Sequence, residues 1–211
     1  MKIAVVAAAG KAGRKIVAEA ANRGHEVTAF VRRKGQIVDG AKDVVVKDIL
    51  DLTADDLKNF DAVVDAFGTF APETLQLHST TLKKLCDVLS DSNVRLLVVG
   101  GAGSLYLDKT HTTQLLDAPN FPDEYKPLAK AQAKALDELR KRDDVKWTFV
   151  SPAADFQADG ERTGKYILAG EEFTLNAAGE SVISYADYAV AMIDEISDGK
   201  HINERISVVK A

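Results

Sequence analysis

The sequence predicts an α/β protein built on a doubly wound, mostly parallel sheet. Strand-like and helix-like segments alternate through the first 150 residues, which is the chain order of repeated βαβ units. The strand-like segments at residues 3–8 and 94–99 are apolar throughout rather than alternating with polar residues. Such runs are typical of strands buried on both faces of a sheet, so helices are expected to cover both faces.

Local signals place the individual elements. Gly24 is expected to end the first helix in a left-handed conformation, and Pro72 suits the first turn of a later helix. Thr53 is a good N-cap for a short helix, with Asp55 and Asp56 in its first turn. We expect strands at residues 3–8, 26–31, 43–46, 62–66, 94–99 and 146–150, and longer helices at residues 11–22, 72–90 and 125–142.

The regular alternation stops after Ser151. Short segments punctuated by glycine follow, and then a helix expected at residues 185–196 and a last strand at residues 206–209. We expect residues 1–211 to form a single domain, in which residues 151–211 contribute a small C-terminal lobe packed on the main sheet.

Composition limits the classes of protein. The chain has 46% hydrophobic residues, enough for a substantial core, and a net charge of −5, which gives no basic surplus for nucleic acid. No segment approaches the roughly 18 apolar residues of a membrane span, and the N-terminal apolar run is too short for a signal peptide. The single cysteine, Cys86, lies in an apolar helical run, as a packed core thiol would. We expect a cytoplasmic protein that binds neither nucleic acid nor membranes, and the sequence leaves monomer and homodimer open.

The strongest motif is the loop VVAAAGKAG at residues 5–13, between the first strand and the first helix. A dinucleotide-binding turn occupies this place in Rossmann-type folds. Gly10 would let the backbone approach a pyrophosphate, and Gly13 would let the helix pack closely on the strand. The helix N-terminus would present free N–H groups to the phosphates. The cofactor contacts expected here are Ala7, Ala9, Gly10, Lys11, Ala12 and Gly13.

This glycine pattern is incomplete. Its first position is Ala7 in one register and Ala8 in the other. Alanine suits that tight turn only if its φ stays negative. A plain strand-to-helix turn of small residues is the alternative interpretation, but the position after the first strand favours the cofactor site.

Three cations, Arg32, Arg33 and Lys34, follow the second strand. A site selective for NAD places a carboxylate here for the ribose 2′-hydroxyl. Guanidinium groups instead pair well with the 2′-phosphate of NADP. We therefore expect NADP(H) to be preferred, with NAD(H) possible, and a solvated basic loop is the alternative.

Taken in order, these segments and later ones resemble a known family. They are residues 7–13, 31–32, 47–49, 65–68, 100–104, 151–152, 160–166 and 183–189. The chain resembles the atypical short-chain dehydrogenases of the NmrA-like, NAD(P)H-binding family, and most of all its candidate NADH-flavin reductases, with biliverdin reductase B as a more distant relative. The resemblance covers almost the whole chain. It implies a Rossmann-type fold in which the C-terminal lobe lies on the substrate side.

The resemblance also implies roles for residues around the adenosine half of the cofactor. Asp48 and Ile49, after the third strand, would contact adenine through a carboxylate and a backbone N–H. Ala66, Phe67 and Gly68, after the fourth strand, would line the crevice for the ribose and pyrophosphate.

Two further pairs are implied around the nicotinamide. Gly100 and Gly101 would lie below the ring, and Ser151 and Pro152 on its other side. All these residues follow carboxyl ends of expected strands, where open α/β sheets bind ligands. Family members usually carry Gly-Ala-Thr-Gly where this chain has AAAG at residues 7–10, so a glycine and a hydroxyl are missing.

The chain lacks the acid–base pair of most short-chain dehydrogenases, Tyr-x-x-x-Lys. None of its five tyrosines has a lysine four residues later, so alcohol oxidation and sugar-nucleotide epimerisation by that pair are not expected. Flavins and quinones accept hydride at an electron-poor centre, and water can supply the proton. We expect an NAD(P)H-dependent reductase acting on a planar acceptor such as a flavin or quinone. A non-catalytic NADP(H)-sensing regulator of the NmrA type is the alternative.

The acceptor side gives weaker signals. Ser104 could act catalytically by donating a hydrogen bond to the acceptor. The alternative is that it is simply a polar residue of the loop. Tyr106, Tyr125 and Phe156 could form aromatic walls for the substrate, and core packing is the alternative for each. The four histidines are scattered without ligand spacing, so no metal site is expected.

Overall fold

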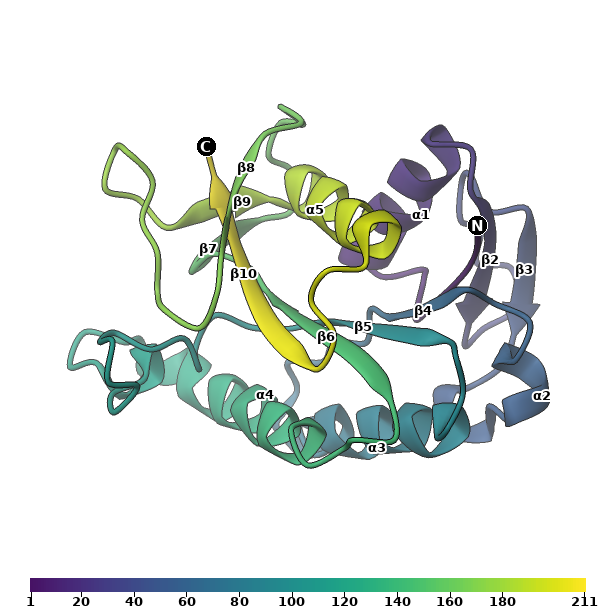
Figure 1. The fold of residues 1–211 in the computed structure, drawn as a ribbon, viewed down its shortest axis with the longest axis horizontal. Coiled ribbons are helices and arrows are strands. Elements are labelled where there is room, and N and C mark those ends of the chain that lie inside the picture. The colour runs from purple at the N-terminus through teal and green to yellow at the C-terminus, as the bar shows by residue number, and fades with distance from the viewer.

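The computed structural model describes all residues, 1–211, and contains one large sheet with helices on both faces (Figure 1). Its eight strands lie in the order β3-β2-β1-β4-β5-β6-β10-β8, all parallel except β8, which pairs antiparallel with β10. The strands are β1 (Lys2–Val6), β2 (Glu26–Val31), β3 (Asp43–Val46), β4 (Ala62–Asp65), β5 (Arg95–Val99), β6 (Lys146–Ser151), β8 (Tyr166–Ala169) and β10 (Glu204–Lys210). The predicted doubly wound, mostly parallel Rossmann-type sheet is confirmed.

Two helical layers enclose this sheet. On one face, α1 (Lys11–Asn22) and α5 (Tyr185–Asp198) pack side by side (Figure 1). On the other lie α2 (Ala54–Leu57), α3 (Leu77–Leu89) and α4 (Lys126–Leu139). Each layer closes its own core, of 26 buried residues under α1 and α5 and of 20 under α3 and α4. None of the helices combines the length and apolar character needed to cross a membrane.

The direction of winding reverses beside β1. From β1 the chain proceeds through β2 to β3 on one side, and then crosses to β4, β5 and β6 on the other. The loops that leave the carboxyl ends of β1 and β4 therefore diverge, and sheets of this kind bind ligands at such a reversal of strand order.

Residues 151–211 contribute elements to the main sheet and to the helical layer on it. Strand β10 pairs with β6 and α5 packs on α1, so both complete the main body. The strands β7 (Asp155–Gln157) and β9 (Val182–Ser184) form a small parallel sheet of their own. With β8, these are three strands that we did not predict. Each has only three or four residues and pairs with a partner distant in sequence, so no local periodicity reveals it.

Two expected helices have different starts. The helix expected at residues 72–90 is interrupted: a 3₁₀ turn spans Pro72–Thr74, and α3 begins only at Leu77. Likewise a 3₁₀ turn at Asp123–Tyr125 precedes α4, which ends at Leu139 rather than at residue 142. Short 3₁₀ turns commonly occur at helix ends, where the sequence pattern cannot distinguish them from α-helix.

Asp65 is a buried carboxyl at the carboxyl end of β4. It is 4% exposed, and its Oδ1 accepts a hydrogen bond from the Phe67 backbone N–H at 3.0 Å. No lysine, arginine or histidine forms an ion pair with it. Burial raises the pKa of Asp65 to about 6, although the bond from Phe67 acts in the opposite direction. The Asp65 carboxyl thus fixes the start of the loop after β4 through its hydrogen bond from Phe67. Its ionisation costs free energy because it is buried.

This burial predicts a pH dependence of stability. The folded pKa lies above the ordinary value, so the folded chain holds the Asp65 proton to higher pH than the unfolded chain does. The free energy of unfolding should therefore fall as pH rises from about 4 to about 6, by up to about 3 kcal/mol. Asp65→Asn keeps an acceptor for Phe67 without the charge. Urea denaturation should show it more stable than the parent at pH 7.5, with the difference shrinking toward pH 4.

Asp39→Asn is the matched control, because Asp39 is exposed and makes no ion pair. It should change stability little at either pH. A destabilised Asp65→Asn variant at pH 7.5, or a difference independent of pH, would contradict this account.

Candidate functional site

The structure brings the expected cofactor residues to one edge of the sheet. Strands β1 to β6 are parallel, so the loops after them all emerge at the same edge. The segments brought together are residues 7–13, 32–33, 48–49, 66–68, 100–101 and 151–152. The candidate site is therefore this carboxyl edge, with the ends of β1 and β4 at its centre.

The β1–α1 turn ends in an uncapped helix N-terminus. The Gly10 N–H donates to the Ala7 carbonyl at 3.1 Å, and Gly10 then serves as the N-cap of α1. No side chain caps this helix, and its first turn contains no acidic residue. The first backbone N–H groups of α1 and the positive end of its dipole are thus available to an anion such as a pyrophosphate.

Our expectation for the missing glycine was wrong. Ala7 has a φ of +55°, in the left-handed region, rather than the negative φ we expected of an alanine at this turn. The chain must leave β1 while the next residue, Ala8, is fully buried and still bonded through its N–H to the Phe30 carbonyl of β2. The turn therefore falls on Ala7 whatever residue stands there, at a cost of about 1 kcal/mol. This conformation also selects the register in which residues 7, 10 and 13 are the three glycine positions.

The two remaining glycines serve different purposes. A Cβ on Gly13 would lie 2.9 Å from three backbone atoms of Ala7 and Ala8, so only glycine lets α1 pack this closely on the strand. A Cβ on Gly10 would meet only the Ala7 carbonyl, at 3.4 Å. The protein itself thus has little need of glycine at position 10, whereas a closely approaching ligand would.

The basic segment after β2 lies next to this turn. Arg32, Arg33 and Lys34 are exposed, and none of them forms an ion pair. Lys11, at the start of α1, is likewise exposed and unpaired. A group of cations without acidic partners is suited to a phosphate-rich ligand.

Sequence reasoning missed Arg14. Its Nε donates to the Ala9 carbonyl at 3.0 Å, and its Nη1 donates to the Ile37 carbonyl at 2.5 Å. The side chain therefore joins the β1–α1 turn to the loop after β2. The sequence did contain a signal. Arg14 lies with Lys11 and Lys15 at a helix start, where cations are unfavourable.

The loops after β3 and β4 are held internally. Asp48 Oδ1 accepts from the Leu50 N–H at 3.0 Å and so caps the 3₁₀ turn Ile49–Asp51. The Phe67 ring packs edge-on against His78, with ring centres 5.5 Å apart. These contacts fix the shape of both loops, and Gly68 beyond them is exposed with no atom near its missing Cβ.

The ends of β5 and β6 are small and tightly packed. A Cβ on Gly100 would lie 2.2 Å from the Phe149 ring, so glycine is required there for packing. Gly101 faces the flexible end of Gln132, whose Oε1 would be 2.1 Å from its Cβ. Ser151 and Pro152 are buried, and the Ser151 hydroxyl has no hydrogen-bond partner.

The residues expected on the acceptor side do not form one cluster. Ser104 is 5% exposed, and its hydroxyl accepts from Arg205 Nη1 at 3.2 Å. Tyr106 stacks on His111 at 4.5 Å, whereas Phe156 packs on Tyr185 and Tyr188 of α5 at 3.9 and 4.8 Å. Tyr125, at the start of α4, is 50% exposed. Arg205 thus holds Ser104 in the fold, and Tyr125 is the most open of the three aromatic side chains expected here.

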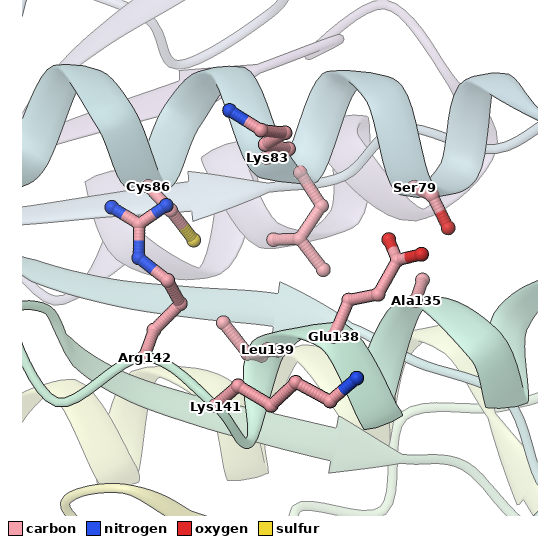
Figure 2. A pocket seen from close by; sticks show the side chains of 9 residues that line it. Ser79, Lys83, Cys86, Ala135, Glu138, Leu139, Lys141 and Arg142 are labelled. Carbon is pink, nitrogen blue, oxygen red and sulfur yellow. The ribbon is translucent and has the colours of Figure 1, made fainter.

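Figure 2 shows a cavity elsewhere, between α3 and α4. Its volume is about 340 Å³, and it is lined by residues including Cys86, Lys83 and Arg142. These lie toward the C-terminal ends of the two helices, away from the carboxyl edge of the sheet. Lys83 pairs with Asp87 and Arg142 with Asp144, while burial raises the pKa of the Cys86 thiol to about 12. We assign this cavity no chemistry, and Cys86 is the packed core thiol that the sequence predicted.

The fold and this edge define a Rossmann-type dinucleotide-binding protein. Comparison with known families is more specific: residues 7–198 match the NAD(P)H-binding family, and the chain belongs to it. The resemblance predicted from the sequence is thereby confirmed.

Individual relatives match this chain over nearly their full length. A crystal structure from Streptococcus pneumoniae TIGR4, described as a candidate NADH-flavin reductase, is 56% identical with a TM-score of 0.96, and all of both chains is covered. The uncharacterized protein YwnB of Bacillus subtilis strain 168 is 49% identical over 99% of this chain and 98% of its own. A candidate epimerase from Bacteroides thetaiotaomicron is 36% identical with a TM-score of 0.85, covering 99% and 96% of the two chains.

The left-handed Ala7 generates a stability prediction. Ala7→Gly removes the Cβ that is strained at a φ of +55°, so it should raise the free energy of unfolding by about 1 kcal/mol. Urea denaturation measures this directly. Ala12→Gly, inside α1, is the matched control and should lower stability by about 0.5–1 kcal/mol. If both variants lost stability equally, the conclusion that Ala7 is strained would be contradicted.

The contrast between the two glycines generates a binding prediction. Gly10→Val should fold with nearly unchanged thermal stability, because little protein lies near the missing Cβ, yet lose NADPH binding by more than tenfold. Gly13→Ala should instead lose stability by about 1–3 kcal/mol, because its Cβ meets backbone. Calorimetric titration and thermal unfolding separate the two effects. Normal NADPH binding by a folded Gly10→Val variant would show that the turn does not hold the pyrophosphate.

Proposed function

We propose that this protein is a reductase that transfers hydride from NADPH to a planar acceptor such as a flavin or quinone. The observation that carries the proposal is the β1–α1 turn, with its uncapped helix N-terminus and open space at Gly10. The description of the streptococcal relative as a candidate NADH-flavin reductase supports the reaction class. The dinucleotide would lie along the carboxyl edge, with its pyrophosphate at Gly10.

The preference for NADPH is proposed from charge. Arg32, Arg33 and Lys34 stand where an NAD-selective site has a carboxylate, and all three are exposed and free of ion pairs. A ribose 2′-phosphate would supply the anion that these cations lack. The crevice for the rest of the cofactor would be lined by Asp48, Ile49 and the segment 66–68, as the family resemblance implies.

The nicotinamide would lie between the ends of β5 and β6. Gly100 and Gly101 carry no side chain, and Pro152 is rigid and buried, so these residues contribute no acid or base of their own. When bound, the dihydronicotinamide supplies the hydride. The chain's contribution would be to hold the two rings parallel and close while excluding water.

Neither Tyr166 nor Tyr188 is placed to act as a strong acid. The Tyr188 hydroxyl is fully buried and donates to the Val150 carbonyl at 2.7 Å, and burial raises its pKa. The Tyr166 hydroxyl donates to Asp194 at 2.8 Å, and its pKa is likewise raised by burial. Acceptors whose proton can come from water suit such a site better than the substrates of an epimerase do.

Turnover with a panel of acceptors tests the reaction. NADPH oxidation should be observed with flavin mononucleotide or a benzoquinone. Tyr125→Phe should lower the rate by less than about tenfold, or 1.4 kcal/mol in the barrier, because no dedicated acid is needed. Ser104→Ala should be similarly mild. A thousandfold loss in either variant would reveal an essential acid, and NADPH binding without turnover on any acceptor would favour an NADP(H)-sensing regulator.

Charge reversal tests the cofactor preference. Arg32→Glu should weaken NADPH binding by about 1–3 kcal/mol and NADH binding much less, because only NADPH carries the 2′-phosphate. Calorimetric titration with both cofactors measures this. Lys84→Glu changes the net charge equally on α3, away from the turn, and should leave both affinities unchanged. Equal affinity of the parent protein for NADPH and NADH would contradict the preference.

A further inference from the structure

Arg14 is exposed in α1, yet its guanidinium is committed to two backbone carbonyls. It donates from Nε to Ala9 at 3.0 Å and from Nη1 to Ile37 at 2.5 Å. Ala9 belongs to the β1–α1 turn, and Ile37 to the loop that begins with Arg32. One side chain therefore spans the two segments that would hold the pyrophosphate and the 2′-phosphate.

Local energetics do not explain an arginine at this position. A cation near a helix N-terminus opposes the helix dipole, and α1 has no acidic residue in its first turn to offset it. Arg14 is also exposed and forms no ion pair. A residue that breaks a local rule in this way is expected to serve the site rather than the helix.

The loop at residues 32–37 has few other supports. Its residues are exposed apart from the half-buried Gln36, and Gly35 has a φ of +79°. Within it, the Arg33 N–H donates to Gln36 Oε1 at 3.0 Å, and Val38 is the first buried residue beyond it. No hydrogen bond other than that from Arg14 joins residues 32–37 to the β1–α1 turn.

We propose that Arg14 is a positioning residue that sets the preference for a 2′-phosphorylated dinucleotide. By bonding to both Ala9 and Ile37, it would hold the basic loop in a fixed position relative to the β1–α1 turn. In that position Arg32 and Arg33 would contact the 2′-phosphate. The inference rests on the proposed NADPH preference. Without this tie the exposed loop pays the entropy of ordering when the phosphate binds, and the preference falls.

The guanidinium itself is needed for this role. Its donors are fixed in one plane and can serve two carbonyls at once, whereas the single ammonium of lysine on its flexible stem cannot hold the same fork. A lysine at position 14 would therefore keep the charge and lose the positioning. This separates a positioning role from a simple contribution to the electric field around the phosphate.

Calorimetric titration with two cofactor fragments tests the proposal. Adenosine 2′,5′-bisphosphate carries the 2′-phosphate and adenosine 5′-monophosphate does not, so the ratio of their dissociation constants isolates the preference. The parent should favour the bisphosphate. Arg14→Met and Arg14→Lys should each reduce the ratio by about tenfold, while monophosphate binding changes by less than about threefold. Lys15→Met is the matched control: Lys15 is the next residue, equally exposed and without a hydrogen bond or ion pair, and its removal should leave the ratio within about twofold.

A second readout requires no ligand. Amide hydrogen exchange of residues 33–37 should be faster in both Arg14 variants than in the parent and in Lys15→Met, with thermal stability nearly unchanged. A ratio that survives in both Arg14 variants, a full rescue by Arg14→Lys, an equal loss in Lys15→Met, or unchanged exchange would overturn the positioning role alone. Equal affinity of the parent for the two fragments would overturn the NADPH preference and this inference together.

Discussion

The close packing of α1 on the end of β1 is the constraint on which the rest of the site depends. Gly13 permits it, because a Cβ there would lie 2.9 Å from three backbone atoms of the turn. With the helix held this near, the turn has only three residues between Val6 and Gly10, and the left-handed conformation falls on Ala7. The N-terminus of α1, which follows this turn directly, has no side-chain cap. A strained alanine and a free helix end are thus linked to one close contact between helix and strand.

Charge is distributed unevenly around this contact. The chain carries a net charge of −5, yet Lys11, Arg32, Arg33 and Lys34 gather at the turn without acidic partners. Elsewhere a number of acidic side chains are paired with cations, as at Glu19, whose pKa is lowered above all by its hydrogen bond from Arg162. Asp65, a buried carboxyl at the end of β4, has its pKa raised by burial to about 6. An anionic ligand would therefore meet a positive edge on a negative protein, which favours both binding and approach.

The opposite side of the edge is held by a different kind of interaction. Arg205 of β10 is buried and donates to the Ser104 hydroxyl and carbonyl, as well as to Glu171, so it ties the loop after β5 to the C-terminal strands. The loop is fixed further out where His111 stacks on Tyr106 and bonds to Glu172 at 2.9 Å. Ser104 thereby helps to fix the loop after β5, and the neighbouring Gly100 and Gly101 carry no acidic group. This arrangement supports a reaction in which orientation matters more than proton transfer by the protein.

The sequence by itself determined the parallel sheet, the glycine turn, the basic segment after β2 and the family. Each of these depends on residues that are neighbours along the chain. Apolar runs define the strands, and Gly10 and Gly13 mark the turn whatever surrounds it. Only the tertiary structure decided what depends on residues far apart. Ala7 is left-handed because Ala8 must still reach β2, Ser104 is held by an arginine about a hundred residues away, and β8 exists only where β10 returns beside it. Arg14 belongs to this second group: its partner Ile37 lies 23 residues further along, and only folding brings that carbonyl within reach of its guanidinium.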